Sequence, residues 1–196
     1  GNIWASGTEG AAKRDMTTGL WQRYRITNTS QVDYFVEDLC LDAIGNVWMT
    51  GNAGPGIGGF QKFDGTRWTG YNEYTYGLGY PFPYPTDNTE AICFRPSDET
   101  IVVNPMFNYL HSWNGSSYTS LNYPNVRSGG LIEDSQNRLW CLGEYYDLSY
   151  HNDINNTWTT VPFVGTGANI RKDPTRTGTV WACSEHQVLR TDGSYN

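Results

Sequence analysis

The sequence predicts an all-β chain made of one repeated four-stranded unit, and three observations support this prediction. A short motif ending in Trp recurs along the 196 residues, its copies lie about 40 residues apart, and most copies are followed by a hairpin signal and a second aromatic residue. Periods of about 20 to 50 residues are typical of repeat architectures. The 22 Gly and 9 Pro residues, with 15% aromatic residues, suit short strands joined by turns.

The Trp motif defines one strand of the unit, which we call strand B. A degraded fifth copy, at 99–102, has Val102 in the Trp place. Successive Trp positions are 44, 54, 38 and 41 residues apart. The clear copies are Gly1-Asn2-Ile3-Trp4, Gly45-Asn46-Val47-Trp48, Asn137-Arg138-Leu139-Trp140 and Gly178-Thr179-Val180-Trp181.

A short apolar strand that ends on an acidic residue precedes three of the copies. These segments, strand A of the unit, cover 36–42, 131–134 and 170–173 and end at Asp42, Asp134 and Asp173. An Asp side chain accepts hydrogen bonds from turn amides, and Gly or Asn tolerates positive φ. We therefore expect a tight turn between strands A and B.

Strands C and D complete the unit as a hairpin. We expect strand C at 59–63, 109–113, 148–151 and 188–191. An Asp-Gly or Asn-Gly pair after a strand favours the two-residue hairpin turn that matches the twist of the strands. The turn signals are Asp64-Gly65, Asn114-Gly115, Asn155-Asn156 and Asp192-Gly193, with the looser Thr18-Gly19 in the first copy. Strand D then carries an aromatic residue of its own, at Trp21, Trp68, Tyr118 and Trp158.

A lone four-stranded meander with two apolar faces must be covered by its neighbours, which predicts the blades of a β-propeller. A β-sandwich is the alternative fold. The expected strands number four A, five B, five C and four D, so they fill neither four nor five whole blades. We expect a single domain, part of a larger ring whose other blades lie outside these residues, with a five-bladed ring as the alternative. Its repeats cover about 1–44, 45–98, 99–136, 137–177 and 178–196.

Two segments carry a resemblance to a known family. Ile132-Glu133-Asp134-Ser135-Gln136-Asn137-Arg138-Leu139-Trp140, and 39–48 with Asp42 and Gly45-Asn46-Val47-Trp48, resemble the two-component regulator propeller repeat. The resemblance covers nearly the whole chain and is weakest in the third copy. It implies a propeller that is commonly the extracytoplasmic sensor part of a bacterial signalling receptor, or a secreted or surface protein, with no shared catalytic residues. The last unit, 181–193, also resembles repeats of propeller lyases that act on cyclic lactone antibiotics.

Charge and composition exclude several classes of partner. The net charge is −7 and Lys and Arg are scattered, which disfavours nucleic acid and anionic membrane surfaces. No window approaches the ~20 apolar residues of a membrane span. Sequons at Asn28, Asn114 and Asn155 give weak support to an extracellular location.

The four cysteines lie in four different repeats, at Cys40, Cys93, Cys141 and Cys183, so we expect them to be buried free thiols.

Few residues suggest a metal, cofactor or phosphate site. The three histidines lie in different repeats, and we expect His111 and His151 at the surface edge of C strands and His186 in a B-to-C loop. The glycine-rich segment 51–59 precedes no helix pattern, so it is expected to be a loop and not a phosphate cradle. We expect no cofactor, no metal and no catalytic residue.

The candidate binding surface lies in the loops that connect D to A and B to C. A meander places these loops at one end of the sheets, and three of them, at 72–85, 104–108 and 143–147, are rich in aromatic residues. Rings beside carboxylates and amides suit a glycan, a peptide or a protein partner, whereas the alternative is that they cover their own blades. The candidate residues are Tyr74, Tyr76, Tyr80, Phe82, Tyr84, Phe107, Tyr145, Tyr146 and Glu144.

The sequence therefore predicts a non-catalytic, extracytoplasmic binding or sensor propeller. The first alternative is a structural surface or assembly protein that uses the propeller for protein–protein contacts. The second is a lyase-like enzyme, for which Glu185 and His186, with Glu144 in the equivalent place after Trp140, are the candidate acid and base groups.

Overall fold

The computed structural model describes residues 2–25, 35–52, 59–71, 89–105, 110–121, 128–143, 147–163, 165 and 167–194. All regular structure in these residues is β-strand, as the sequence predicted. The chain forms two compact units, 1–92 and 93–196, and their boundary lies within strand β8 (Thr89–Arg95).

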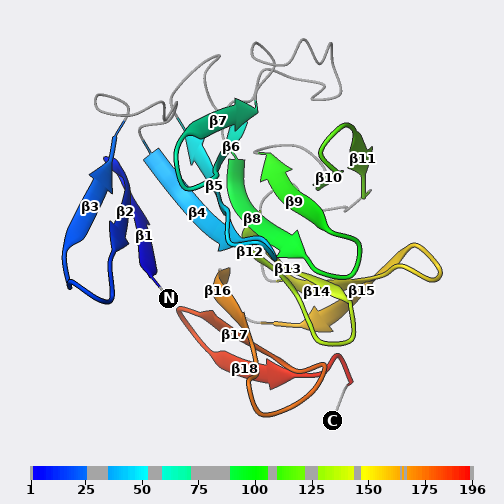
Figure 1. Cartoon of the computed structure of the whole chain (residues 1–196). Coiled ribbons are helices and arrows are strands. Elements are labelled where there is room, and N and C mark those ends of the chain that lie inside the picture. Colours follow the sequence, from blue (N-terminus) through cyan, green and yellow to red (C-terminus); the bar gives the residue numbers. More distant parts are fainter. Residues whose placement is uncertain are drawn as a thin grey trace. The chain divides into compact units, whose positions relative to one another are not determined.

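The first unit contains two antiparallel meanders (Figure 1). The first is a three-stranded sheet of β1 (Ile3–Gly7), β2 (Gly10–Arg14) and β3 (Trp21–Tyr24). The second is a four-stranded sheet of β4 (Phe35–Leu41), β5 (Val47–Asn52), β6 (Gly59–Phe63) and β7 (Trp68–Tyr71).

Three further meanders follow, each in sequence order. The third sheet begins with β8 and continues with β9 (Thr100–Pro105), β10 (His111–Trp113) and β11 (Tyr118–Ser120). The fourth contains β12 (Ser128–Glu133), β13 (Leu139–Gly143), β14 (Asp147–Asn152) and β15 (Thr157–Pro162). The fifth contains β16 (Gly167–Lys172), β17 (Val180–Ser184) and β18 (Val188–Thr191).

The described strands reproduce the predicted inventory of four A, five B, five C and four D strands. The first sheet holds strands B, C and D, the last holds A, B and C, and each of the other three holds all four. Strand C of the second and fifth sheets has the predicted bounds, 59–63 and 188–191. The predicted borders near 44, 98, 136 and 177 all fall in turns between strands A and B. The first four repeats drawn from the Trp motif therefore each span parts of two sheets.

The turn between strands A and B is fixed by the acidic residue that the sequence singled out. Asp134 accepts hydrogen bonds from the Arg138 amide at 3.1 Å and from Trp140 Nε1 at 2.7 Å. Asp42 makes the equivalent bonds to the Asn46 amide at 2.8 Å and to Trp48 Nε1 at 2.9 Å. One carboxylate therefore closes the turn and also orients the Trp of strand B.

The backbone of this turn persists where the side chains change. The residue three places before the Trp position has φ of +88° at Gly45, +57° at Glu99, +64° at Asn137 and +68° at Gly178. Gly adopts these angles without strain and Asn tolerates them, which explains why these two residues occupy this place in the clear copies of the motif. In the fifth sheet the turn holds two extra residues, and Asp173 binds Arg190 and Thr175. Trp181 is 40% exposed, whereas Trp140 is fully buried.

Aromatic rings hold together the two sheets of the first unit. Trp4 stacks on Tyr24 with ring centroids 5.2 Å apart and meets Phe63 at 5.7 Å, and Trp68 stacks on Phe63 at 4.8 Å. Val47 and Met49 complete the buried cluster. The D-strand aromatic of the second sheet is thus covered by residues of the first.

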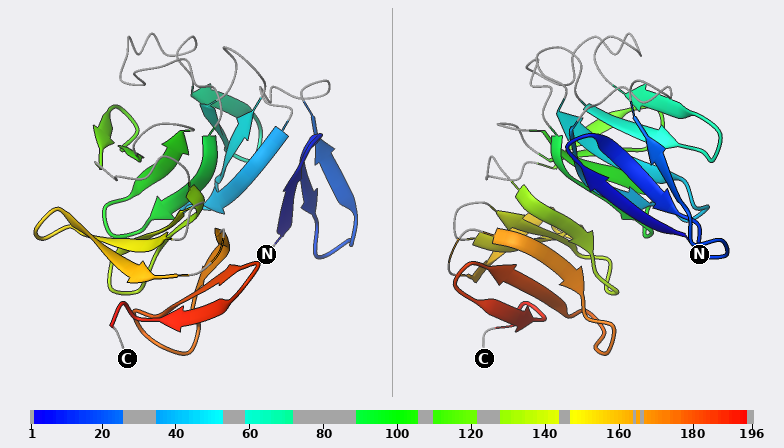
Figure 2. Two further views of the ribbon diagram at one scale, coloured as in Figure 1. Left: turned by 180° about the vertical axis from the view of Figure 1, so that it is seen from behind. Right: turned by 90° about the vertical axis from the view of Figure 1, so that its left-hand side faces the viewer.

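The fourth and fifth sheets share the core of the second unit. Strands β12 and β16 lie side by side (Figure 2), and an added Cβ on Gly130 would lie 3.0 Å from Ile170 Cγ2. Trp140, Leu142 and Leu148 pack in one cluster with residues of the fifth sheet, among them Val180. Arg138 adds hydrogen bonds to the carbonyl oxygens of Gly178 and Asp192, at 2.5 and 2.7 Å.

The histidine prediction is only partly correct. His111 and His151 lie in C strands, but both are buried and neither is at the surface. His151 lies on the face of β14 opposite to Leu148, where its ring packs 5.0 Å from that of Trp158 and its two nitrogens lie within hydrogen-bond distance of Asp153 and Asn156, and these contacts depend on the register of β14 and β15. Burial lowers the pKa of His111. The cysteine prediction is confirmed in part: the four cysteines form no disulfide in the described residues, and Cys93 and Cys141 are buried, whereas Cys40 and Cys183 are partly exposed.

Replacing the Asp of the fourth sheet tests the Asp–Trp turn. Asp134→Ala leaves the buried Trp140 Nε1 without its acceptor, so we expect a loss of about 1–3 kcal/mol in the free energy of unfolding, measured by urea denaturation. Asp64→Ala is the control, because the Asp64 carboxylate accepts bonds in an exposed turn that water can replace. An equal loss in both variants would contradict the assigned role of Asp134.

Asp173 predicts an acid-sensitive contribution to stability. The Thr175 hydroxyl, assisted by the Thr175 amide and Arg190 and opposed by burial, lowers the pKa of Asp173 from 3.8 to about 2. A lowered carboxylate pKa stabilises the folded state above the unfolded-state pKa, and this contribution disappears as the pH falls through the folded-state pKa. We expect the stability difference between the wild type and Asp173→Asn to be constant above about pH 5 and to shrink between about pH 4 and pH 2. Urea denaturation across this range measures it, and a constant difference down to pH 2 would refute the assignment.

Candidate functional site

Each meander has two ends, which differ in their connections. The BC end is the end at which strand B connects to strand C and strand D connects to the next sheet. The AB end is the opposite end, which holds the A–B and C–D turns. In the second unit, an added Cβ on Gly165, in a D-to-A connection, would lie 2.8 Å from Ser184 Oγ and 3.1 Å from His186 Cδ2, in a B-to-C turn. These two kinds of connection therefore gather at one end there, as expected.

All of the predicted ligand-binding residues fall outside the described residues. They belong to 72–88, 106–109 and 144–146, which join ends of described strands such as Tyr71, Thr89 and Gly143. The aromatic site stays a prediction, and its members are Tyr74, Tyr76, Tyr80, Phe82, Tyr84, Phe107, Glu144, Tyr145 and Tyr146.

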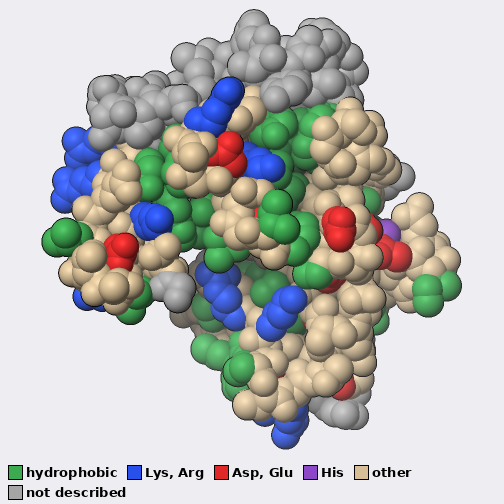
Figure 3. Space-filling view, in the orientation of Figure 1, with side chains coloured by type: hydrophobic (Ala, Val, Ile, Leu, Met, Phe, Trp, Pro, Cys, Tyr) green, Lys and Arg blue, Asp and Glu red, His purple; other side chains and the backbone are tan. Residues whose placement is uncertain are grey.

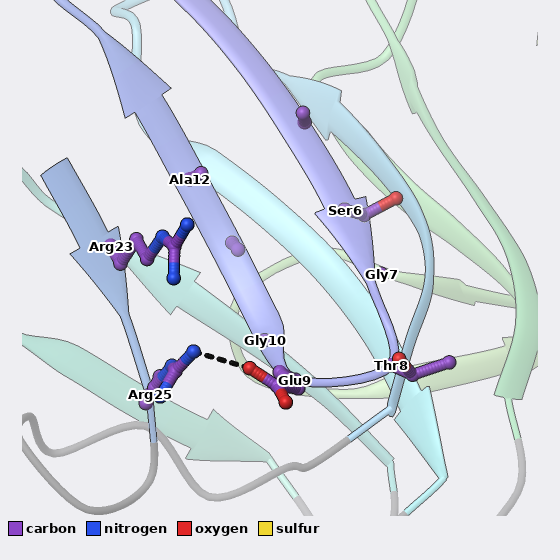
Figure 4. A pocket seen from close by; sticks show the side chains of 10 residues that line it. Ser6, Gly7, Thr8, Glu9, Gly10, Ala12, Arg23 and Arg25 are labelled. Carbon is purple, nitrogen blue, oxygen red and sulfur yellow. Dashed lines mark hydrogen bonds and ion pairs between the residues drawn. The ribbon is translucent and has the colours of Figure 1, made fainter. Parts of the chain in front are cut away.

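The described part of the BC end contains a hollow that the sequence analysis did not identify (Figure 4). It has a volume of about 350 Å³ and lies on the first sheet, beside the turn that joins β1 to β2. Its floor is built from small residues, because Ala5 pairs with Ala12, and Gly7 with Gly10. Small side chains in two neighbouring rows of a sheet leave the space above them empty.

Two arginines border this hollow, Arg23 in β3 and Arg25 directly after the end of β3. Side chains two residues apart on a strand point to the same face, so Arg23 and Arg25 lie on one side of the sheet, over β2 (Figure 4). Arg25 forms an ion pair with Glu9 of the β1–β2 turn. Figure 3 shows Lys and Arg side chains over this sheet, at the left of the view. The sequence signal for these residues is the Arg-x-Arg spacing at Arg23 and Arg25. It could not be interpreted from the sequence, because the register of β3 against β2 was not known.

A second charged cluster lies at the AB end of the second unit, and it is structural in character. The buried Arg95 donates to Glu133 at 3.1 Å and to Asp153 at 2.5 Å. Glu133 also accepts hydrogen bonds from the amide and hydroxyl of Ser97. Burial would lower the pKa of Arg95, but the bond to Asp153 and the charges of Asp98 and Glu133 outweigh it and raise the pKa.

Removing one partner tests whether the Arg95 cluster holds the fold. Arg95→Ala leaves Glu133 buried and unpaired, so we expect the free energy of unfolding to fall by about 3–5 kcal/mol in urea denaturation. The double variant Arg95→Met with Glu133→Leu removes both charges and is expected to recover most of the loss. A double variant no more stable than Arg95→Ala would contradict the view that the unpaired, buried Glu133 causes the loss.

The candidate enzyme residues form no enclosed acid–base site among the described residues. His186 lies in the B-to-C turn after β17, as predicted, and its Nε2 is 3.8 Å from Glu185 Oε1, with both side chains exposed. Of the glycine-rich segment, 53–58 lies outside the described residues. Within the described ranges, no three His, Cys, Asp or Glu residues are grouped so that they could hold a metal ion. No helix in that part of the chain could cross a membrane.

The comparisons with known proteins rest on structure. No family model and no curated protein matches the sequence. Solved structures do match along nearly the whole chain. The extracellular domain of a candidate one-component system from B. thetaiotaomicron has a TM-score of 0.75 at 8% identity, over 97% of this chain and 26% of its own.

Two other matches belong to different functional classes. Virginiamycin B lyase from Staphylococcus aureus has a TM-score of 0.68 at 14% identity, over 97% of this chain and 66% of its own. PorZ, a bacterial surface component of the type-IX secretion system of Porphyromonas gingivalis, has a TM-score of 0.68 at 8% identity, over 98% and 30%.

The chain spans about a quarter to two thirds of the length of these neighbours. At these identities the likeness concerns the fold. Extracellular domains of one-component and two-component systems are among the propellers that share it. The all-β meanders and these matches together identify the chain as part of a β-propeller, the fold implied by its resemblance to the two-component regulator propeller repeat.

Proposed function

We propose that the chain belongs to an extracytoplasmic sensor or binding propeller that recognises its ligand at the BC end of the sheets. The observation that carries this proposal is the difference between the two ends. The AB end is built from turns that side chains close, as Asp42, Asp64, Asn114 and Asp134 do. The BC end holds the connections whose length and composition vary from sheet to sheet.

The structural neighbours support the proposal of a sensor, because extracellular domains of candidate one-component and hybrid two-component systems are among them. A lyase and a gluconolactonase are among them as well. A sensor of this type needs a recognition surface and no catalytic residues. The aromatic loops would supply that surface by stacking on a glycan, a peptide or a protein partner.

Substitutions in the longest aromatic loop test this proposal. We expect Tyr76→Ala and Tyr80→Ala to abolish or strongly weaken binding to a glycan or peptide array, because a stacking ring typically contributes about 1–3 kcal/mol. The control is Ile154→Ala, because Ile154 is exposed in a C–D turn, and we expect this change to leave binding unchanged. Tyr150→Ala is unsuitable as a control, because Tyr150 packs against the core. Array binding that survives both Tyr substitutions would contradict the proposed contact surface.

A structural or assembly role is the second candidate. The first sheet exposes Ile3, Leu20 and Trp21, and large exposed apolar side chains in one region suit contact with another protein. The likeness to PorZ, a surface component of a secretion system, belongs to this class. Self-association in sedimentation velocity that Trp21→Glu abolishes would favour this role over ligand sensing.

A catalytic role has less support. The likeness to virginiamycin B lyase concerns the fold at 14% identity. Glu185 and His186 lie at the BC end, but solvent screens both of them, and enclosure is what usually tunes an acid–base pair. We therefore retain the non-catalytic proposal.

A further inference from the structure

We infer that Asn114 is a site of spontaneous deamidation, which converts its side-chain amide into a carboxylate that the surrounding turn can hold. Asn114 and Gly115 form the only Asn-Gly pair in the sequence, and they lie in the C–D turn of the third sheet. This inference goes beyond the proposed function, because the turn lies at the AB end and belongs to none of the aromatic loops. It rests on the exposure of the turn, on the hydrogen bonds to the Asn114 side chain and on the residues at the same place in other sheets.

The turn exposes both reacting groups to water. Asn114, Gly115 and the two serines that follow them are exposed. The Gly115 amide donates no hydrogen bond to any other described residue, so a base in the solvent can remove its proton. Gly115 has φ of +95°, which suits Gly, and an added Cβ there would have no atom within 4 Å. No side chain therefore shields the Gly115 nitrogen.

The hydrogen bonds of the turn polarise the carbonyl group that the Gly115 nitrogen attacks. Asn114 Oδ1 accepts bonds from the Ser116 amide at 3.0 Å, the Ser116 hydroxyl at 2.9 Å and the Ser117 amide at 2.9 Å. Donors that point at an oxygen stabilise the negative charge that develops on it when a nucleophile adds to the carbonyl carbon. The same bonds hold the side-chain carbonyl against the backbone that follows Asn114.

The reaction needs only water. A base removes the proton of the Gly115 amide, and the nitrogen forms a bond to Cγ of Asn114. The bond from Cγ to Nδ2 then breaks, and the side-chain nitrogen leaves as ammonia, which gives a cyclic succinimide. Water adds to the Cγ carbonyl, breaks its bond to the Gly115 nitrogen and leaves a carboxylate at position 114. Addition of water to the main-chain carbonyl carbon gives isoaspartate instead, and no oxidant or reductant takes part.

The equivalent turn of the second sheet shows that its donors accept a carboxylate. The turns of the second and fifth sheets carry Asp before Gly, in Asp64-Gly65 and Asp192-Gly193. Asp64 Oδ1 accepts bonds from the Thr66 amide at 2.8 Å, the Thr66 hydroxyl at 2.7 Å and the Arg67 amide at 2.9 Å. The Arg67 amide, followed by the hydroxyl and the amide of Thr66, lowers the pKa of Asp64 from 3.8 to about 2. The turn therefore favours the ionised carboxylate.

Deamidation gives the turn of the third sheet the acceptor that the second and fifth sheets already use. A charged oxygen replaces a neutral one in front of the same two amides and hydroxyl, and hydrogen bonds to an ionised acceptor are stronger. We therefore expect the turn to keep its fold when the product is aspartate. Isoaspartate adds a carbon atom to the main chain and does not reproduce the turn.

Peptide mapping by mass spectrometry tests the site on the whole folded chain. The protein is incubated in mildly alkaline buffer, and samples are digested at mildly acidic pH so that digestion itself adds little deamidation. We expect aspartate and isoaspartate to accumulate at position 114 severalfold faster than at Asn155, which is also exposed in a C–D turn but precedes Asn156. Incubation at mildly acidic pH is expected to slow the reaction, because a base must remove the Gly115 proton.

Three variants separate the causes. Gly115→Ala places a side chain beside the attacking nitrogen and is expected to slow deamidation severalfold. Ser116→Ala removes one donor to the carbonyl oxygen but neither amide donor, and we expect a smaller decrease in rate. Ser194→Ala is the matched control, because it removes the equivalent hydroxyl from the turn of the fifth sheet and is expected to leave the rate at Asn114 unchanged.

The stability of the product is tested separately. We expect Asn114→Asp to be at least as stable as the wild type in urea denaturation at neutral pH, because the carboxylate accepts the same hydrogen bonds. A less stable Asn114→Asp would refute the part of the inference that concerns the turn.

Defined outcomes overturn the inference. These are an unmodified Asn114, equal accumulation of product at Asn114 and Asn155, or a rate that Gly115→Ala does not lower. A rate that Ser116→Ala leaves unchanged or raises would refute the polarising role of the hydrogen bonds. The proposed function is tested by array binding and the Tyr76→Ala and Tyr80→Ala variants, so either idea can fail while the other stands.

Discussion

The structure depends on one constraint: every sheet has two faces, and a sheet buries its Trp residue only when another sheet lies against it. Strand B of the fourth sheet places Trp140 in the core shared with the fifth, where its indole nitrogen would be a buried donor without an acceptor. Asp134 supplies the acceptor from the preceding turn. Burial of the ring and closure of the A–B turn are therefore achieved by the same carboxylate, which explains why Asp and Trp recur together in the sequence.

The AB end keeps its role even where its residues change. In the third sheet both Asp and Trp are lost, and the buried Arg95, bound to Glu133 and Asp153, links the A–B turn to the fourth sheet instead. In the fifth sheet Arg190 binds Asp173 and lies over Trp181, 5.1 Å from the ring centroid. Different side chains thus hold the same turn, whereas the connections of the BC end share no common motif in the sequence. This difference is the reason for proposing that recognition occurs at the BC end.

Sheets that lack a covering neighbour among the described residues expose what the others bury. Trp21 of the first sheet is 52% exposed, whereas the equivalent Trp68 of the second sheet is 2% exposed and is covered by Trp4 and Tyr24. The first sheet also differs along its length. Ile3 and Trp21 lie toward its AB end, and the small residues and arginines lie toward its BC end.

The sequence by itself determined the strands and turns of this protein. The spacing of Trp, the Asp before it and the Asp-Gly or Asn-Gly signals after it are local features, so they predicted all 18 described strands and the A–B turns. They also placed the candidate aromatic residues in connections, but a connection has no repeated pattern, and its geometry cannot be derived from one copy.

Only the tertiary structure decided which side chains meet across strands and sheets. The burial of His111 and His151, the Arg95 cluster and the arginine-bordered hollow were not predicted, because each depends on strand register or on the packing of one sheet on the next. Arg23 and Arg25 are single basic residues in the sequence. Arg23 faces Ala12 only because strands β2 and β3 align in one register, and pairing across strands is a long-range interaction that local sequence does not encode.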